Sequence, residues 1–230
     1  MAKKKVVKTV VTTEEVITTD EKTQIVCVLD RSGTMSSIIN TAIDGFNEYL
    51  NKQKQLEDDA TITIALFDDQ YELLYDNVPL NEVEPLTRNV WSPRGMTALH
   101  DAIGKTINSV RAAHKKMKKN DRPDKVLVCI VTDGLENYSK EYQLDDIVKL
   151  TRECEADGWN FIYLAANQDA FDVGVKLGVS AGNTFTWTAD DVGVSNFTMA
   201  MSNATTYYRS TTADVGDYGN LMSDHAEEDN

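Results

Sequence analysis

The sequence is poor in the residues that build disulfide scaffolds and metal–thiolate sites, with three cysteines and three histidines in 230 residues. Three is an odd number, and Cys27 and Cys129 lie in apolar, strand-like runs, where a thiol behaves as a small hydrophobic side chain. We therefore expect buried free thiols in a reducing, cytoplasmic compartment. The histidines, His100, His114 and His225, are scattered, so we expect surface or capping roles for them and no catalysis.

Long apolar runs are also missing. No window approaches the roughly 18 apolar residues that a membrane-spanning helix needs. The N-terminal stretch "MAKKKVVKTVVTTEEV" is basic and rich in Val, but Thr, Lys and Glu interrupt each apolar run and no cleavage site of small residues follows. We expect neither a membrane span nor a signal peptide.

Positively charged residues are scarce, because the sequence has 23 Lys and Arg residues against 37 Asp and Glu residues, which gives a formal net charge of -14. A surface of this sign repels a phosphate backbone unless a local basic patch overcomes it. Nucleic acid is therefore not the expected partner, and nothing in the composition indicates an oligomeric state.

The sequence does contain a regular alternation of strand-like and helix-like segments. Apolar or alternating runs predict strands, and apolar residues at helical spacing predict helices between them. This order predicts a Rossmann-like, doubly wound α/β fold with a mostly parallel sheet, one antiparallel edge strand, and helices on both faces. The expected strands are 23–30, 60–69, 70–76, 124–134, 159–167 and 183–188, and the expected helices are 38–50, 99–117, 143–158, 168–177 and one starting near 192.

Both ends of the chain differ from this pattern. Residues 1–21 alternate Val and Thr with charges and suit an extended arm, and residues 211–230 carry six acidic residues without Lys or Arg. We therefore expect one domain over 22–210, preceded by the arm and followed by an acidic, disordered tail.

Three polar clusters fall where predicted strands end or helices begin, at the sheet edge where ligands bind in such folds. Asp30, Ser32 and Thr34 follow the first strand, Thr97 opens a helix, and Asp133 follows the central strand. Two carboxylates and three hydroxyls suit a hard divalent cation, Mg²⁺ first, with Mn²⁺ or Ca²⁺ as alternatives. Without His or Cys nearby, zinc is not expected.

The segments "DRSGTM", "GMTALHDAI" and "VTDGLEN" resemble the three parts of the metal-ion-dependent adhesion site (MIDAS) of von Willebrand factor A domains. The resemblance covers about residues 23–210 by order of elements and points to intracellular bacterial or phage members of the family. There are two departures, because Thr34 replaces the usual serine and Met96 stands where a second glycine is common.

The resemblance implies a function as well as a fold. It implies that Ser32 and Thr34 bind the metal directly with Asp30 in the same loop, that Thr97 binds directly or through water, and that Asp133 acts through water. One coordination position stays open and is completed by an Asp or Glu of a protein partner. The expected function is metal-dependent protein binding without enzymatic activity.

Four residues near these segments are candidates for contacting the partner: Trp91, Met96, Glu136 and Asn137. Trp91 could line the partner surface or anchor its Pro-containing loop on the core. Glu136 and Asn137 could contact the metal's waters or the partner, or be solvated.

An enzymatic alternative stays open. "DRSGT" also resembles the phosphorylation loop of P-type ATPases and haloacid-dehalogenase relatives, in which Asp30 would be a covalent nucleophile. Phosphatases of that group need a second acid where this chain has Ser32. A lysine would also be needed, for which Lys105 or Lys125 could be argued.

Each cluster also has a plain structural interpretation. Ser36 or Ser37 could cap the first helix, Thr97 could cap the next one, and Asp133-Gly134 could form a turn. Near the C-terminus, Thr188 and Asp191 resemble the N-cap of the last helix and its partner three residues on.

Overall fold

The computed structural model describes residues 21–166 and 170–211. The predicted arm, apart from Glu21, and the predicted tail, apart from Thr211, lie outside the described residues, as do the first two positions of the helix expected at 168–177. The described residues form one sheet in the order β3-β2-β1-β4-β5-β6, in which only the β2–β3 pair is antiparallel. The predicted fold class is confirmed. The strands are β1 (Thr23–Asp30), β2 (Ala60–Phe67), β3 (Tyr71–Pro79), β4 (Lys125–Thr132), β5 (Trp159–Ala166) and β6 (Thr184–Trp187).

Burial along the strands follows their place in the sheet. Every residue of β1 is buried and β4 is buried after its first residue, as expected for central strands covered on both faces. β3 has no fully buried residue, which fits its position at the edge. The continuous apolar runs of the sequence therefore mark the centre of the sheet.

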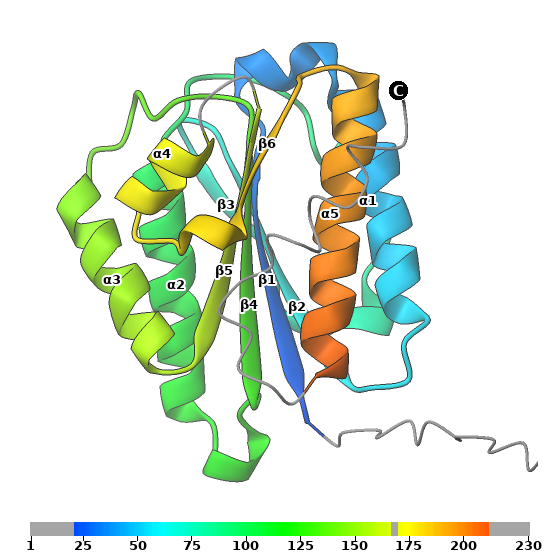
Figure 1. Cartoon of the computed structure of the whole chain (residues 1–230), viewed down its shortest axis with the longest axis vertical. Coiled ribbons are helices and arrows are strands. Elements are labelled where there is room, and N and C mark those ends of the chain that lie inside the picture. The colour runs from blue at the N-terminus through cyan, green and yellow to red at the C-terminus, as the bar shows by residue number, and fades with distance from the viewer. Residues whose placement is uncertain (1–20, 167–169, 212–230) are drawn as a thin grey trace, which may run out of the picture.

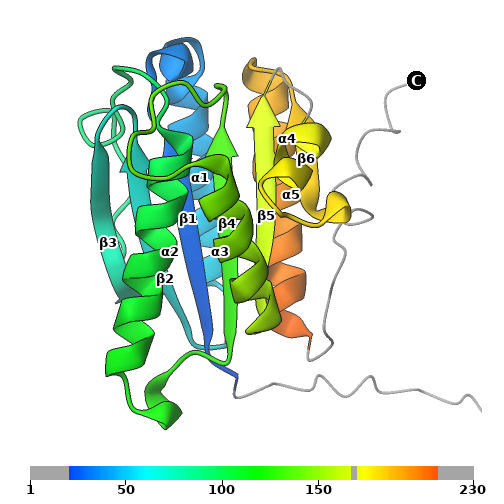
Figure 2. The ribbon, with the colours of Figure 1, turned by 90° about the vertical axis from the view of Figure 1, so that its left-hand side faces the viewer.

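Helices cover both faces (Figure 1). α1 (Ile39–Lys54) and α5 (Asp191–Ser210) pack side by side on one face, and α2 (Leu99–Lys116), α3 (Leu144–Ala156) and α4 (Ala170–Lys176) cover the other, as Figure 2 also shows. Because side chains of a strand alternate between faces, Ile25 joins the core under α1 and α5, and Val26 joins the core under α2 and α3. Two apolar layers thus hold the sheet between them.

The strand order reverses direction between β1 and β4. The chain leaves β1 toward β2 and β3, and then returns through α2 to place β4 on the other side of β1. The carboxyl ends of β1 and β4 therefore lie at a topological switch point, the usual position of a ligand site in open α/β sheets.

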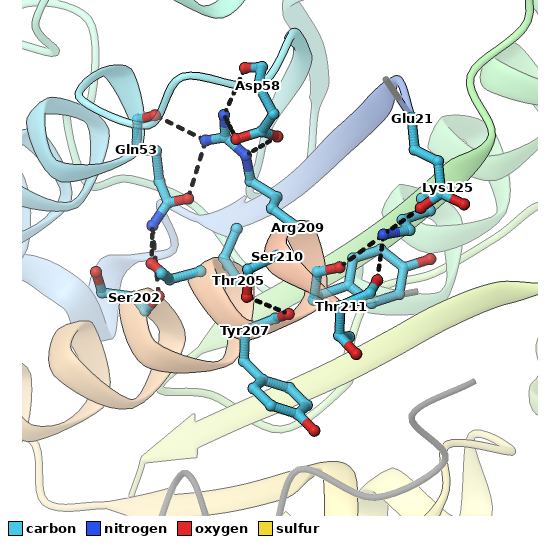
Figure 3. A network of polar contacts seen from close by, with 12 residues as sticks. Glu21, Gln53, Asp58, Lys125, Ser202, Thr205, Tyr207, Arg209, Ser210 and Thr211 are labelled. Atoms are coloured by element: carbon cyan, nitrogen blue, oxygen red, sulfur yellow. Dashed lines mark hydrogen bonds and ion pairs between the residues drawn. The ribbon is translucent and has the colours of Figure 1, made fainter. Parts of the chain in front are cut away.

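The opposite end of the molecule is fastened by Arg209, near the end of α5 (Figure 3). Its guanidinium is buried and donates two parallel hydrogen bonds to the Asp58 carboxylate, 2.8 and 2.9 Å long, and others to the Asp58 and Gln53 carbonyl oxygens. Such bidentate, charge-assisted bonds are among the stronger polar contacts in proteins. They fix the end of α5 to the end of α1.

Three capping interpretations are wrong. The N-cap of α2 is Ala98, not Thr97, and it provides no side-chain cap. The N-cap of α5 is Asp190, not Thr188, because the Asp190 carboxylate accepts the Gly193 N–H at 2.7 Å. Ser36 and Ser37 belong to a short 3-10 helix at Gly33–Ser37, and the N-cap of α1 is Ile38, without a side-chain cap. The loop after β1 is therefore an ordered turn of its own.

All three cysteines are buried and free, as the sequence predicts for Cys27 and Cys129. Among the helices that the structure describes, none has the length and apolar character to cross a bilayer.

Candidate metal centre

Asp30, the last residue of β1, lies at the bottom of the predicted site. Its side chain is fully buried, and each carboxylate oxygen accepts one hydrogen bond of 2.6 Å, from the Ser32 backbone N–H and from the Thr132 hydroxyl. The bond from Ser32 turns the chain sharply after the strand, and the bond from Thr132 joins the ends of β1 and β4. Asp30 thus fixes the position of the loop that follows it.

The two hydroxyls of this loop face each other and the next segment. Ser32 Oγ lies 3.0 Å from Thr34 Oγ1, which donates a 2.6 Å hydrogen bond to Asp133 Oδ1. Asp133 directly follows β4, so this bond links segments 99 residues apart in the sequence. Oxygen atoms of both predicted loops therefore converge at the switch point.

Thr97 completes the group from a third segment. A Cβ on Gly134 would lie 2.9 Å from Thr97 Oγ1 and 3.5 Å from Thr34 Oγ1, so both hydroxyls border the same glycine. The Gly33 N–H donates to the Gly95 carbonyl at 3.3 Å, which joins the loops that carry Thr34 and Thr97. The structure brings all five predicted metal-site residues together.

The two carboxylates have no cationic partner among the described Lys, Arg and His side chains. Burial raises the pKa of Asp30 to about 7, against the opposing effect of its hydrogen bonds, and burial also raises the pKa of Asp133. A buried carboxylate without a counterion is costly unless it is protonated or meets a cation. This donor set fits a divalent cation, which would supply that charge.

The kind of donors limits the kind of metal. Within the residues that the structure describes, no three His, Cys, Asp or Glu side chains group so as to hold a metal ion. The centre instead offers two carboxylates and three hydroxyls, the oxygen donors that hard cations prefer. Asp30, Ser32, Thr34, Thr97 and Asp133 would hold the ion, and their role as ligands stays a prediction.

Asp68 organises the loops around the centre, although the sequence interpretation did not include it. Its fully buried carboxylate accepts from Arg31 Nε at 3.0 Å and from Arg94 Nε at 2.6 Å, and its other oxygen accepts the Gln70 N–H. The Arg94 N–H also donates to the Arg31 carbonyl at 2.8 Å. Asp68 therefore ties the loop after β1 to the loop that carries Thr97. Its one visible signal is its place directly after a buried strand at the same sheet edge.

Asn137 and Glu136 fasten the segment after Asp133 to the start of α2. The Asn137 side-chain carbonyl accepts the Thr97 N–H at 2.9 Å, and the Asn137 N–H donates to the Thr97 carbonyl at 3.0 Å. The Glu136 carboxylate accepts the backbone N–H groups of His100, Tyr138 and Ser139. Asn137 is exposed and Glu136 is half-buried, and both side chains also hold loop backbone in place. Their contact with a partner stays a prediction.

Asp101 also fixes a loop near the centre, and the sequence interpretation did not include it. Its carboxylate accepts the backbone N–H groups of residues 140–142 at 2.9–3.0 Å. Burial alone raises the pKa of Asp101, but these donors outweigh it and lower the pKa.

The remaining partner candidates separate clearly. Trp91 is fully buried, packs edge-on against Phe46, and donates from Nε1 to the Asp30 carbonyl at 2.8 Å. Its interpretation as part of a partner surface is wrong, and the alternative, an anchor of its loop on the core, is correct. Met96 is 47% exposed beside Thr97, so it remains available for contact.

The geometry offers little to a phosphotransfer reaction at Asp30. Both of its carboxylate oxygens are engaged and the side chain has no exposed area. Lys105 pairs with Glu141 at 2.7 Å, and Lys125 begins β4 at the opposite end of the sheet, where it pairs with Glu21. The two lysines that could be argued for this role are thus committed to acidic partners.

No protein-family model and no curated protein sequence matches this chain. Solved structures do match by fold. Proximal thread matrix protein 1 from the mussel byssus, with a zinc-occupied MIDAS motif, is 14% identical with a TM-score of 0.55, over 81% of this chain and 46% of its own.

Two bacterial structures, each 11% identical with a TM-score of 0.54, match over 79% of this chain. They are a von Willebrand factor type A protein from Catenulispora acidiphila, covered over 42% of its length, and the vWF domain of the type V pili tip protein Mfa5 from Porphyromonas gingivalis, covered over 95%. The chain thus spans less than half of the mussel and Catenulispora chains. At such low identity the likeness shows the fold alone.

Proposed function

We propose that this chain, which has the von Willebrand factor A fold, is a divalent-metal-dependent protein-binding module. The observation that carries the proposal is the convergence of five oxygen-bearing side chains from three segments. Two of the five are carboxylates without a cationic partner, the buried Asp30 and the half-buried Asp133. A mussel protein of the same fold with a zinc-occupied MIDAS motif supports metal binding in general. For this chain we propose Mg²⁺, with Mn²⁺, Ca²⁺ and Zn²⁺ to be compared.

Each protein group has a distinct task in this proposal. Two short hydrogen bonds fix the orientation of the Asp30 side chain. In this position Asp30 orients Ser32 and makes the electrostatic potential at the site more negative. Ser32 and Thr34 present neutral oxygens 3.0 Å apart, and Asp133 aligns Thr34 by accepting a hydrogen bond from its hydroxyl group. Thr97 closes the group from the α2 side.

The balance of charge explains why an acidic partner would bind. A divalent ion held mainly by neutral hydroxyls keeps much of its charge and attracts a further carboxylate strongly. We propose that an Asp or Glu side chain of a protein partner completes the coordination. The net charge of -14 disfavours nucleic acid as the partner.

We propose a binding role without catalysis, because the Asp30 carboxylate that a phosphotransfer mechanism needs is buried and engaged in hydrogen bonds.

The buried free thiols suit a reducing compartment, so we propose a cytoplasmic location.

The experiment that tests the function is calorimetric titration of Mg²⁺, Mn²⁺, Ca²⁺ and Zn²⁺ into the wild type and two variants of Thr97. Thr97→Val keeps the shape of the side chain and removes the hydroxyl, whereas Thr97→Ser keeps the hydroxyl. We expect Thr97→Val to weaken binding at least tenfold and Thr97→Ser to stay within threefold of the wild type, with both variants folded by circular dichroism.

The variant Asp30→Ala distinguishes metal-dependent protein binding from the phosphotransfer alternative. If Asp30→Ala loses metal binding while Thr97→Val binds like the wild type, the adhesion site is refuted, and Asp30 should be tested for a phosphoryl intermediate. If no divalent ion binds the wild type at millimolar concentration, the metal-dependent function itself is refuted.

A further inference from the structure

Large apolar side chains are exposed at the same end of the molecule as the proposed metal site. Nine are exposed among the residues that the structure describes, and six of them lie in segments at the carboxyl edge of the sheet. Three belong to the loops that carry the site residues, and three stand in the first turns of helices that begin at this edge (Figure 1). These are Met96, Leu135 and Tyr138, and then Leu144, Phe171 and Val192.

Met96 and Leu135 are the direct sequence neighbours of site segments. Met96 precedes Thr97 and is 47% exposed, and Leu135 lies two residues after Asp133 and is 60% exposed. Single exposed apolar residues are common on protein surfaces, but a gathering of them beside polar groups is typical of interaction sites. Met96 and Leu135 therefore flank the oxygen cluster, and with Tyr138 they are the exposed apolar side chains on the loops that carry it.

These side chains stand on ordered loops. Asn137 forms hydrogen bonds with the backbone N–H and carbonyl groups of Thr97. The Glu136 carboxylate accepts the backbone N–H groups of His100, Tyr138 and Ser139. The Lys140 ammonium lies 4.1 Å from the centre of the Tyr138 ring and restrains it. Because the loops are already fixed, a partner would lose little free energy in ordering them.

Charge decides which acidic partner fits. A net charge of -14 repels an acidic segment at long range, and at physiological salt this repulsion is screened over about 8 Å. A run of Asp and Glu residues would meet this repulsion with every additional charge. A single carboxylate with apolar neighbours would meet it once and gain from burial against Met96 and Leu135.

We propose that the partner recognised at this surface presents one acidic residue flanked by apolar side chains, rather than a cluster of acidic residues. This inference rests on the proposed metal-dependent function, because the acidic residue would bind at the metal site. It adds that Met96, Leu135 and Tyr138 select the residues next to the acid.

The test is selection from a displayed library of seven-residue peptides with Asp or Glu fixed at the centre and the six flanking positions random. Peptides are bound to the full chain in Mg²⁺ and eluted with EDTA. We expect the eluted pool to be enriched at least threefold in Leu, Ile, Val, Met and Phe next to the acid, and depleted in further Asp and Glu.

The outcomes separate the two proposals. An EDTA-eluted pool with random or acidic flanks supports the metal-dependent function and overturns the inference about the flanks. The absence of an EDTA-eluted pool above that of the Thr97→Val variant refutes the proposed function, and the inference falls with it.

Matched methionine variants then test the surface itself. We expect Met96→Gln to weaken the binding of a selected fluorescent peptide about tenfold, the usual effect of losing one buried apolar contact. Met199 is 38% exposed on α5, and we expect Met199→Gln to change the affinity for this peptide less than twofold. Metal affinity and thermal unfolding should be unchanged in both. Equal peptide binding by the two variants overturns the inference.

Discussion

The substitution Asp68→Asn tests whether a buried ion-pair network, outside the oxygen cluster, shapes the proposed metal site. Asp68 has no exposed side-chain area and meets two guanidinium groups, that of Arg31, which is 4% exposed, and that of Arg94, which is 52% exposed. Asparagine keeps the size and one acceptor for the Gln70 N–H but removes the charge. The buried Arg31 cation then loses its buried partner.

The magnitude follows from these exposures. Removing one member of a buried pair costs about 3–5 kcal/mol, because the other charge stays buried. The lower end applies here, since Arg94 can turn to water and Arg31 keeps a 2.5 Å contact with the half-exposed Glu72. We expect a loss of about 3 kcal/mol, which for a domain of this size lowers the melting temperature by about 6–12 °C.

Urea unfolding followed by circular dichroism measures the change, with Asp69→Asn as the matched control because Asp69 is exposed. Titration of Mg²⁺ should show at least a tenfold loss of affinity in Asp68→Asn and no change in Asp69→Asn. The double variant Arg31→Met, Asp68→Asn should recover part of the lost stability, because no buried charge remains unpaired. A loss below 0.5 kcal/mol in Asp68→Asn would refute the reasoning.

Three further predictions follow from the same structure. Because the pKa of Asp101 is lowered, its stabilising effect is complete above the ordinary carboxyl pKa and is lost as the pH falls through the lowered value. Urea unfolding in chelator between pH 7 and 2.5 should therefore show a steeper decline of stability below pH 4 for the wild type than for Asp101→Asn. At pH 7 this variant should be about 2 kcal/mol less stable than the wild type. Gly134→Ala should weaken Mg²⁺ binding at least tenfold in calorimetry, because its Cβ would lie 2.9 Å from Thr97 Oγ1. Gly158→Ala, at φ +85° with nothing within 4 Å, should cost about 1 kcal/mol without changing metal affinity. Arg209→Met should lower stability by about 3 kcal/mol in the same unfolding assay, since Asp58 loses its buried partner, and a change below 0.5 kcal/mol would contradict the network of Figure 3.

The sequence by itself determined the order of strands and helices and the three oxygen clusters. Hydrophobic periodicity is a local property, so continuous apolar runs marked the central strands β1 and β4, and a more polar run marked the edge strand β3. The clusters were visible because parallel strands end at a common edge, which places Asp30 and Asp133 side by side once the strand order is given.

Only the tertiary structure decided which side chains hold the site and which remain free. The ion pairs of Asp68 and the backbone contacts of Asp101 and Asn137 join groups at least 26 residues apart, and such contacts leave no periodic signal along the chain. Burial is likewise a property of the packed fold. Trp91 and Met96 lie in one loop five residues apart, yet one is fully buried and the other half exposed, because the fold places Phe46 and the end of β1 against the first and solvent against the second.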